Sequence, residues 1–275
     1  MGIVCGRTTL TLSRDQVAEL LSVERVDAPE LPPNWNVAPT QPVFVAAVSN
    51  AGLRHLRALR WGLIPSWAKD PRIGARLINA RAETLGAKPA FRDGARWRRG
   101  LAAFDGFYEW RLAEPEVPEG GVPQSSYSEA GNSRNSLRAA RPPSQPYYFR
   151  RADGKPLVFC VLWDIWWDAE GLPLRSFSIV TTRANKTMAP VHHRMPAILG
   201  PEHWDEWLQP SPLGQHRLRE LLAPARDDLL SVHPVRTTVN STVNNGPELI
   251  EPLPAGETTE PRVPDQAAQQ SLNFR

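Results

Sequence analysis

Apolar and polar residues alternate along this chain mostly in short runs, the pattern of strands that bury one face. Two such runs flank a turn at residues 49–52, so a hairpin is predicted from residues 42–48 and 53–61. By the same pattern, further strands are predicted at residues 77–83, 101–110, 147–151, 157–166, 177–182 and 230–235.

Helical spacing is rarer. Val17, Leu20 and Leu21 recur at intervals of three and four after Ser13, a good N-cap, which predicts a short helix over residues 13–21. Two more helices are predicted at residues 201–208 and 214–222, and a proline-stiffened extended loop at residues 32–39. Strands dominate without βαβ alternation. We therefore predict an α+β fold with a curved, mostly antiparallel, barrel-like β-sheet core and short flanking helices.

Two segments are too polar to bury much surface. Residues 113–145 are rich in Pro, Gly, Ser, Asn and Arg, and they lie between two predicted strands. They are predicted to be a disordered insertion at a hairpin tip, and residues 254–275 a disordered tail. Residues 1–253, which include this insertion, are predicted to form a single domain.

The net charge of +3 conceals an uneven distribution. Residues 54–111 contain thirteen Arg and Lys against five Asp and Glu, and the chain has ten tryptophans. Cations for phosphates and flat rings for bases suit a nucleic-acid surface. Composition alone favours the alternative, a solvated basic face with the tryptophans in the core.

The two cysteines, Cys5 and Cys160, have such different settings that no disulfide framework is predicted, and Cys160 lies in an apolar run typical of a core strand. We find neither an apolar run long enough to cross a membrane nor the pattern of a signal peptide, so a cytoplasmic protein without membrane contact is predicted. No pair among the six histidines and two cysteines has HxxxH or CxxC spacing, so neither a metal site nor a cofactor is predicted.

Polar residues interrupt apolar or turn-like stretches at a few places. These are Cys5-Gly6-Arg7, Asn36-Val37-Ala38-Pro39, Trp61-Gly62-Leu63-Ile64-Pro65-Ser66-Trp67, Asn79-Ala80-Arg81-Ala82-Glu83, Asp105-Gly106-Phe107-Tyr108-Glu109-Trp110, His192-His193-Arg194-Met195-Pro196 and Val243-Asn244-Asn245. In these stretches, which occur in the order typical of the family over residues 5–252, the chain resembles the SRAP family (SOS-response-associated peptidases), the abasic-site processing proteins.

The resemblance implies binding to single-stranded DNA and trapping of the ring-opened aldehyde of an abasic site by an N-terminal cysteine. By motif, Cys5 is then the nucleophile, Asn79 positions the sugar, Glu109 is the acid and base at the amine, and His192 assists ring opening. His193 is adjacent, and only the alignment of the motif assigns this role to His192 and not to His193. The DNA contacts implied are Arg7, Asn36, Pro39, Trp67, Arg81 and Arg194. A bacterial protein bound to DNA would associate with the nucleoid.

The chemistry of the residues agrees with these roles. A cysteine with a free α-amine is a 1,2-aminothiol, whose nitrogen forms a Schiff base with an aldehyde and whose sulfur then closes a thiazolidine ring. Glu109 is flanked by aromatic residues on an apolar strand, so its carboxyl is expected to be partly desolvated, with a raised pKa. The turn before Trp67 favours an exposed ring.

One feature departs from the family, whose members usually begin Met-Cys. Three residues separate Met1 from Cys5 here. Either translation starts at codon 4, where Val4 would be encoded by the initiator GTG, or a leader is removed by self-cleavage. We favour the first, and we expect a chain that keeps all four leading residues to form no thiazolidine.

Two other functions remain open: an N-terminal-nucleophile cysteine peptidase that uses Cys5 on an acyl group, and a non-catalytic single-strand nucleic-acid binding module. Lyase activity through the Schiff base would accompany the crosslinking function. A monomer is predicted.

Overall fold

A computed structural model of the chain describes residues 5–49, 51–112 and 144–254. The predicted insertion, apart from its last two residues, and nearly all of the predicted tail lie outside these ranges. Residues 144 and 145 belong instead to a strand, in which the buried Gln145 side chain donates hydrogen bonds to the carbonyls of Pro146 and Val235. The predicted insertion is therefore two residues too long at its end.

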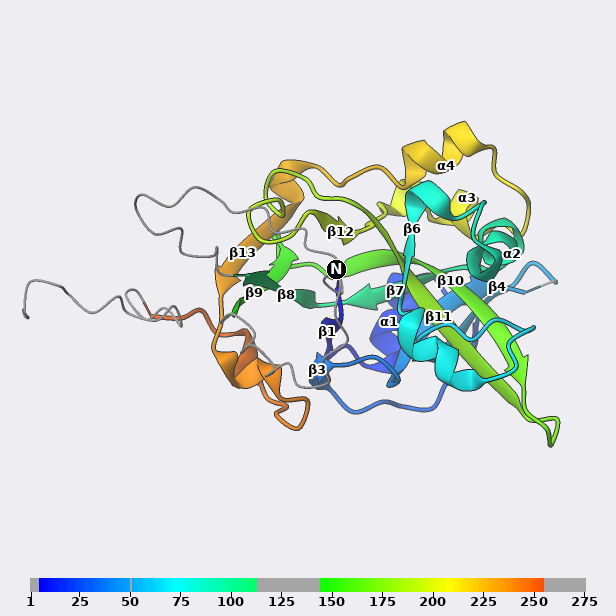
Figure 1. Cartoon of the computed structure of the whole chain (residues 1–275), viewed down its shortest axis with the longest axis horizontal. Coiled ribbons are helices and arrows are strands. Elements are labelled where there is room, and N and C mark those ends of the chain that lie inside the picture. The colour runs from blue at the N-terminus through cyan, green and yellow to red at the C-terminus, as the bar shows by residue number, and fades with distance from the viewer. Residues whose placement is uncertain (1–4, 50, 113–143, 255–275) are drawn as a thin grey trace, which may run out of the picture.

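The strands form two sheets (Figure 1). Across the first lie, in order, β13 (Leu230–Pro234), β9 (Ser144–Arg151), β8 (Gly106–Leu112), β1 (Arg7–Leu10) and β3 (Asn34–Val37). Across the second lie β12 (Arg194–Pro196), β11 (Pro173–Arg183), β10 (Leu157–Trp167), β7 (Arg99–Phe104), β4 (Pro42–Val48), β5 (Arg54–Trp61) and β2 (Arg25–Val26), with β6 (Asn79–Arg81) beside β11.

The second sheet closes on itself, because β5 also pairs with β11, in parallel register. The strands β4, β5, β11, β10 and β7 thus form a barrel, and most of their pairings are antiparallel. A closed barrel leaves no free edge among its own strands. The predicted fold class is confirmed.

Short helices lie outside the strands, and α2, α3 and α4 gather on one side of the molecule (Figure 1). The helices are α1 (Arg14–Leu20), α2 (Pro89–Trp97), α3 (Trp204–Leu208) and α4 (Gln215–Leu221). The 3₁₀ turns are η1 (Pro71–Arg76), η2 (Ala82–Thr84), η3 (Pro201–His203), η4 (Asp227–Leu229), η5 (Thr237–Asn240) and η6 (Pro247–Ile250). The helix α1 begins as predicted. Ser13 Oγ accepts from the amide of Gln16, whose side chain accepts from the Ser13 amide.

Several parts of the structure differ from the prediction. The predicted strand 101–110 is two strands that belong to different sheets, since the chain crosses from β7 to β8 at Asp105, whose carboxylate accepts from the amide of Thr11. The predicted loop 32–39 contains the strand β3, which pairs with β1. The predicted strand 77–83 gives way to the turn η2 after Arg81.

The strands β1, β2 and β12 and the helix α2 were not predicted. The glycine of α2, Gly94, lies against β10, and a Cβ at this position would be 3.3 Å from the side chain of Leu162. A glycine in the interior of a helix weakens the sequence signal for a helix, but here it allows close packing.

Candidate active site

Cys5 lies directly before β1, and its relation to Glu109 is set by strand pairing. Since β1 and β8 are antiparallel with Arg7 opposite Tyr108, the chain that enters β1 passes alongside Glu109. The backbone nitrogen of Cys5 donates a hydrogen bond of 2.8 Å to Glu109 Oε2. The Cys5 backbone has a φ of +46°. The two residues predicted to act on the same amine are therefore in direct contact.

Burial controls the protonation of both groups. Glu109 is 3% exposed, and burial raises the pKa of its carboxyl to about 7, although the amides of Cys5 and Trp110 favour the charged form. This confirms the desolvation predicted from its aromatic neighbours. Burial, and then the charge of Glu109, raise the pKa of the Cys5 thiol well above its usual value. Near neutral pH the carboxyl can thus both give and take a proton, while the thiol stays protonated.

A loop of residues 239–244 is fixed beside Trp110 by side chains of β1 and β3. Arg7 donates to Asn36 Oδ1 at 2.6 Å and to the Val239 carbonyl at 2.9 Å. The buried Asn36 amide in turn donates to the carbonyls of Val239, Ser241 and Asn244. The sequence alone suggested DNA contact for Asn36, whereas the structure places its side chain inside, where it holds the loop.

The side chain of Trp110 lies at the edge of this group. Its Nε1 donates to Asn240 Oδ1 at 2.7 Å, and the Arg7 guanidinium lies 5.8 Å from the centre of its ring. Neither Trp110 nor Asn240 was singled out from the sequence as a site residue. The place of Trp110 in the motif Asp105–Trp110 was the available signal. Since successive residues of a strand face opposite sides, its ring lies on the other face of β8 from Glu109, with Tyr108 and Arg7.

A second group of predicted site residues surrounds the last part of β11. Strand β6 pairs with one edge of β11, so that Asn79 lies opposite Ile179 and Arg81 opposite Thr181. Strand β12 pairs with β11 as well, with Arg183 opposite Arg194. These pairings bring together Asn79, Arg81, Arg194 and, two residues before β12, His192.

Arg194 is buried, and its guanidinium is occupied. It forms a bidentate ion pair with Glu83, at 2.9 and 3.2 Å, and donates to the Thr181 carbonyl. This differs from the expected contact with DNA, because a buried guanidinium with these partners holds β12 against η2 instead.

The ring of His192 is held by its own loop. Its Nδ1 accepts a hydrogen bond of 3.0 Å from the Arg194 amide, so in the neutral ring the proton is on Nε2. Burial and the stacked ring of His193, 4.3 Å away, lower the pKa of His192. A neutral imidazole with Nε2–H is a hydrogen-bond donor near pH 7.

The two groups are connected through the hydrophobic core. Phe107, two residues before Glu109, packs edge-on against Phe159 of β10, with ring centres 5.8 Å apart. Phe159 also forms a β-bridge with Ile198, which follows β12. Cys5, Ala80 and Met195 accordingly belong to one continuous hydrophobic core.

The remaining predicted DNA contacts vary in exposure. Arg81 is exposed and Pro39 half-buried, and the Trp67 ring is 58% exposed, as its turn predicted. The neighbours of Trp67 are tied to β10: the Ser66 amide donates to Asp164 Oδ2, and Trp166 Nε1 donates to the Ala68 carbonyl. Trp67 therefore lies along the other half of β10, away from the residues around Cys5 and His192.

The other predictions concern cysteines, metals and membranes. Both cysteines are buried free thiols, so Cys160 is a core residue as predicted. Within residues 5–49, 51–112 and 144–254, no group of three His, Cys, Asp or Glu side chains is arranged to hold a metal ion. No helix in these ranges is long and apolar enough to cross a membrane.

Comparisons with known proteins agree on one family. The sequence model of the SOS response associated peptidase (SRAP) family matches residues 4–242. The chain is 35% identical over 249 residues to the abasic site processing protein YoqW of Bacillus subtilis, covering 90% of this chain and 99% of that protein. It is 28% identical over 291 residues to the abasic site processing protein HMCES of Rattus norvegicus, covering 94% of this chain and 79% of that protein.

Solved structures share the fold. A protein from Bacteroides thetaiotaomicron superposes with a TM-score of 0.71 at 24% identity, over 90% of this chain and 100% of that one. A phage-related protein from Bordetella bronchiseptica gives a TM-score of 0.59 at 26% identity, over 85% of this chain and 95% of that one.

Proposed function

Because the chain belongs to the SOS response associated peptidase (SRAP) family, we propose that it processes abasic sites in single-stranded DNA by forming a covalent crosslink through Cys5. The observation that carries the proposal is the 2.8 Å hydrogen bond between the Cys5 nitrogen and Glu109 Oε2. It places a buried carboxyl on the nitrogen that must exchange protons during imine formation. Burial raises the pKa of this carboxyl to about 7 while Cys5 is still joined to residue 4.

The proposed reaction begins with a free amine at Cys5. The amine attacks the C1 aldehyde of the ring-opened sugar and gives a carbinolamine, with Glu109 removing the excess proton from nitrogen. Glu109 returns a proton to the hydroxyl, which leaves as water, and a Schiff base remains. The thiol then adds across the carbon–nitrogen double bond, its proton passes to nitrogen, and the thiazolidine ring closes. The balance is aldehyde plus aminothiol giving thiazolidine plus one water.

The second group of residues would act on the sugar. We assign Asn79 to positioning the reacting sugar and His192, through Nε2–H, to donating a hydrogen bond to the ring oxygen as the sugar opens. The Nδ1 contact with the Arg194 amide fixes the orientation of this imidazole.

Among the proposed DNA contacts, Arg7, Pro39, Trp67 and Arg81 keep a direct role. Trp110 joins them, since its ring lies beside the Arg7 guanidinium. Asn36 and Arg194 are assigned positioning roles instead, because each is buried with partners of its own. Asn36 holds the loop 239–244, and Arg194 holds β12 and with it His192.

The reaction requires that Cys5 be the first residue, since an amide nitrogen forms no Schiff base. Initiation at codon 4 followed by removal of the initiator would meet this requirement. Self-cleavage would meet it as well: the Cys5 thiol attacks the carbonyl of residue 4, the amide bond breaks as nitrogen takes a proton from Glu109, and water then hydrolyses the thioester. Mass spectrometry of the endogenous protein would identify its first residue. An intact Met1 on protein that crosslinks DNA would contradict the proposal.

The test uses protein that begins at Cys5, mixed with a single-stranded oligonucleotide that carries one abasic site. We expect a heat-stable adduct that Cys5→Ala abolishes and that Cys160→Ala, a change of the other buried cysteine, leaves intact. Glu109→Gln should slow adduct formation by about 100-fold, the usual scale for loss of a general acid–base group. Unchanged adduct formation in Cys5→Ala would exclude the mechanism.

The same mixture separates the alternative functions. Turnover of peptides without a DNA adduct would indicate an N-terminal-nucleophile peptidase. Salt-sensitive DNA binding without an adduct would indicate a binding module alone. Strand cleavage at the abasic site that accompanies a borohydride-reducible adduct would show lyase activity through the Schiff base.

A further inference from the structure

The loop that follows β5 and the end of α2 meet at one carboxylate on the β10–β11 hairpin. Asp164 of β10 accepts a hydrogen bond of 3.0 Å from the Ser66 amide and one of 3.3 Å from Arg98 Nη2. Ser66 directly precedes Trp67, and Arg98 directly follows Trp97, the last residue of α2. The two tryptophans therefore flank one buried carboxylate, although they belong to different elements.

Both of these indole rings are exposed to solvent. Trp67 is 58% exposed and Trp97 is 49% exposed. The buried face of α2 is complete without Trp97, since it consists of Phe91, Gly94 and Ala95. One exposed tryptophan on a surface needs no explanation, but two beside the same anchoring carboxylate form a pair of flat apolar surfaces. Unpaired bases stack on such rings.

The surface around the rings is cationic. Arg92, Asp93 and Arg96 are exposed on the same face of α2 as Trp97, and the carboxylate of Asp93 lies 3.6 Å from Arg92 Nε. Lys69 is exposed in the loop on the other side. Among the residues that the structure describes, no carboxylate forms an ion pair with Arg96 or Lys69. Positive charge without a protein partner suits the phosphates of a nucleic-acid strand.

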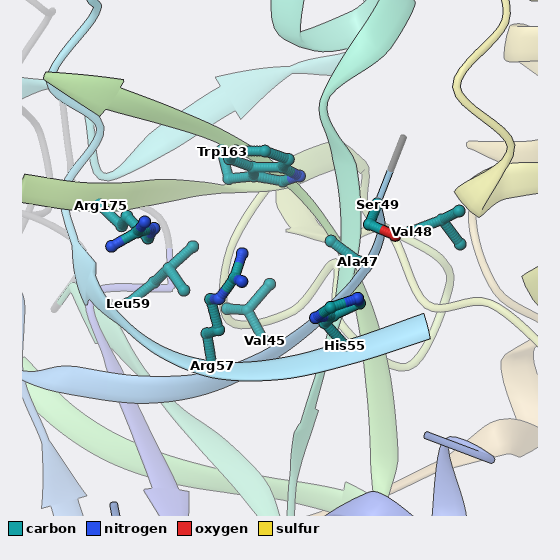
Figure 2. Close-up of a pocket in the computed structure, with 9 residues that line it drawn as sticks. All are labelled: Val45, Ala47, Val48, Ser49, His55, Arg57, Leu59, Trp163 and Arg175. Carbon is teal, nitrogen blue, oxygen red and sulfur yellow. The ribbon is translucent and has the colours of Figure 1, made fainter. Parts of the chain in front are cut away.

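The opposite face of the β10–β11 hairpin has a different character. Successive residues of a strand alternate between faces, so Trp163 and Arg175 lie on the face away from Asp164. There they line a pocket together with Arg57 (Figure 2). The volume of this pocket is about 50 Å³, far below the roughly 300 Å³ at which ligand pockets begin. Trp167 shares this face and is 58% exposed, so it is a matched control for the two rings on the other face.

We propose that Trp97, Arg96 and Arg92 extend the surface for single-stranded DNA from Trp67 onto α2. One base stacks on each of the two rings, and the phosphates beyond Trp97 follow the arginines along the helix. The ligand is unpaired DNA, because a duplex keeps its bases stacked on one another. This inference rests on the proposed binding of single-stranded DNA, but it uses none of the residues assigned to the abasic sugar.

The test is fluorescence anisotropy with a labelled single-stranded oligonucleotide that has no abasic site, so that no crosslink contributes. We expect Trp97→Ala to weaken binding by about tenfold, the scale of one stacked base. Trp97→Phe keeps an aromatic ring and should retain most of the affinity. Arg96→Gln should reduce the slope of log K against log salt by about 0.7, the value for one phosphate of a single strand.

The controls are Trp167→Ala and Arg226→Gln, which change exposed side chains outside this surface and should bind as wild type does. Unfolding curves verify that every variant folds. The matching duplex should bind equally to wild type and Trp97→Ala, since its bases cannot stack on the ring.

The outcomes distinguish this inference from the proposed function. Equal affinity of wild type and Trp97→Ala for the single strand would overturn the inference and leave crosslinking through Cys5 unaffected. An equal loss in Trp167→Ala, or an equal loss for the duplex, would overturn it as well. Wild type that binds no single strand would overturn both proposals. Protein that begins at Cys5 and forms no adduct, while Trp97→Ala still weakens binding, would overturn the crosslinking alone.

Discussion

At the scale of single residues, the contact between Cys5 and Glu109 joins two residues that the sequence singled out, and both are buried. Both residues could be chosen from the sequence, because each interrupts an apolar stretch and the aromatic neighbours of Glu109 predict desolvation. The complete burial of Cys5 agrees with the other interpretation of a lone cysteine, a small buried hydrophobic residue at the start of a first strand. The inward direction of Asn36 and Arg194 could not be predicted: a motif shows that a polar residue matters, but not whether it contacts a ligand or supports the residues that do.

The raised pKa of Glu109 predicts a dependence of stability on pH in the chain that retains residues 1–4. Folding raises the pKa of this carboxyl from 4.5 to about 7, so the folded state binds the proton more tightly. Its contribution to stability is complete below pH 4.5 and is lost as the pH rises through 7. We expect Glu109→Gln to gain about 3 kcal/mol relative to wild type between pH 4.5 and pH 8, as an upper bound.

Denaturant unfolding of wild type and Glu109→Gln at the two pH values measures this difference. A constant gap between the two proteins would show that the carboxyl keeps an ordinary pKa. As a control, Glu206→Gln removes an exposed carboxyl whose pKa is lowered by Arg217, so its effect on the pH dependence should have the opposite sign.

At the scale of elements, the candidate site depends on pairings between segments far apart in the chain. The strands longer than five residues could be predicted from alternation, and their existence is confirmed at β4, β5, β10 and β11. The break at Asp105 could not be predicted, because β7 and β8 form one apolar run that changes sheets without a change of composition. Strand β3 was hidden by its flanking prolines. These two errors fall where the chain builds the site.

Asn36 is the element-scale link between β3 and the loop 239–244. Replacing Asn36 by Ala leaves the Asn244 carbonyl without a donor, removes one of two donors from the carbonyls of Val239 and Ser241, and removes an acceptor of Arg7. We expect a loss of about 2 kcal/mol in unfolding free energy. Asn244→Ala removes one exposed hydrogen bond, to the Thr238 carbonyl, and should cost less than about 1 kcal/mol. Equal losses in chemical denaturation would mean that Asn36 does not hold the loop.

Trp67 tests the proposed DNA surface, and the β10–β11 hairpin offers a control. Trp67 and Trp167 are each 58% exposed, so replacing either by Ala should change stability little. If a base stacks on Trp67, Trp67→Ala should weaken binding of single-stranded DNA by about 1–3 kcal/mol, whereas Trp167→Ala should bind as wild type does. Fluorescence anisotropy with a labelled oligonucleotide would measure both. Identical affinities in the two variants would remove Trp67 from the surface.

At the scale of the whole molecule, the barrel separates the basic stretch 54–111 into unrelated places. Its arginines lie on β5, η1, β6, α2, β7 and β8 or next to them. Arg54 pairs with Asp205, Arg57 pairs with Asp27, and Arg99 is buried against the carbonyls of α2 and α3. The sequence predicted the excess charge but not its distribution, because neighbours in the chain occupy different faces once a barrel closes.

The β8–β9 pairing makes a prediction about residues 113–143. Leu112 and Ser144 lie opposite each other in the ladder, so this segment begins and ends at adjacent points. Replacing it by a two-residue Asn-Gly turn should leave the fold intact and preserve or slightly raise the melting temperature, since a shorter loop costs less entropy to close. Circular dichroism and thermal melting would measure this. Loss of the cooperative transition would show that the segment is required for folding.

The left-handed backbone of Cys5 has one more consequence. A φ torsion is defined by the carbonyl carbon of the preceding residue, and at +46° a side chain other than glycine's is crowded by its own backbone. Once nothing precedes Cys5, that torsion no longer exists. The free amine can then rotate about the N–Cα bond toward an incoming carbon while it stays within hydrogen-bonding distance of Glu109. Cleavage before Cys5 would therefore relieve the steric crowding and free the reacting nitrogen to turn, both at once.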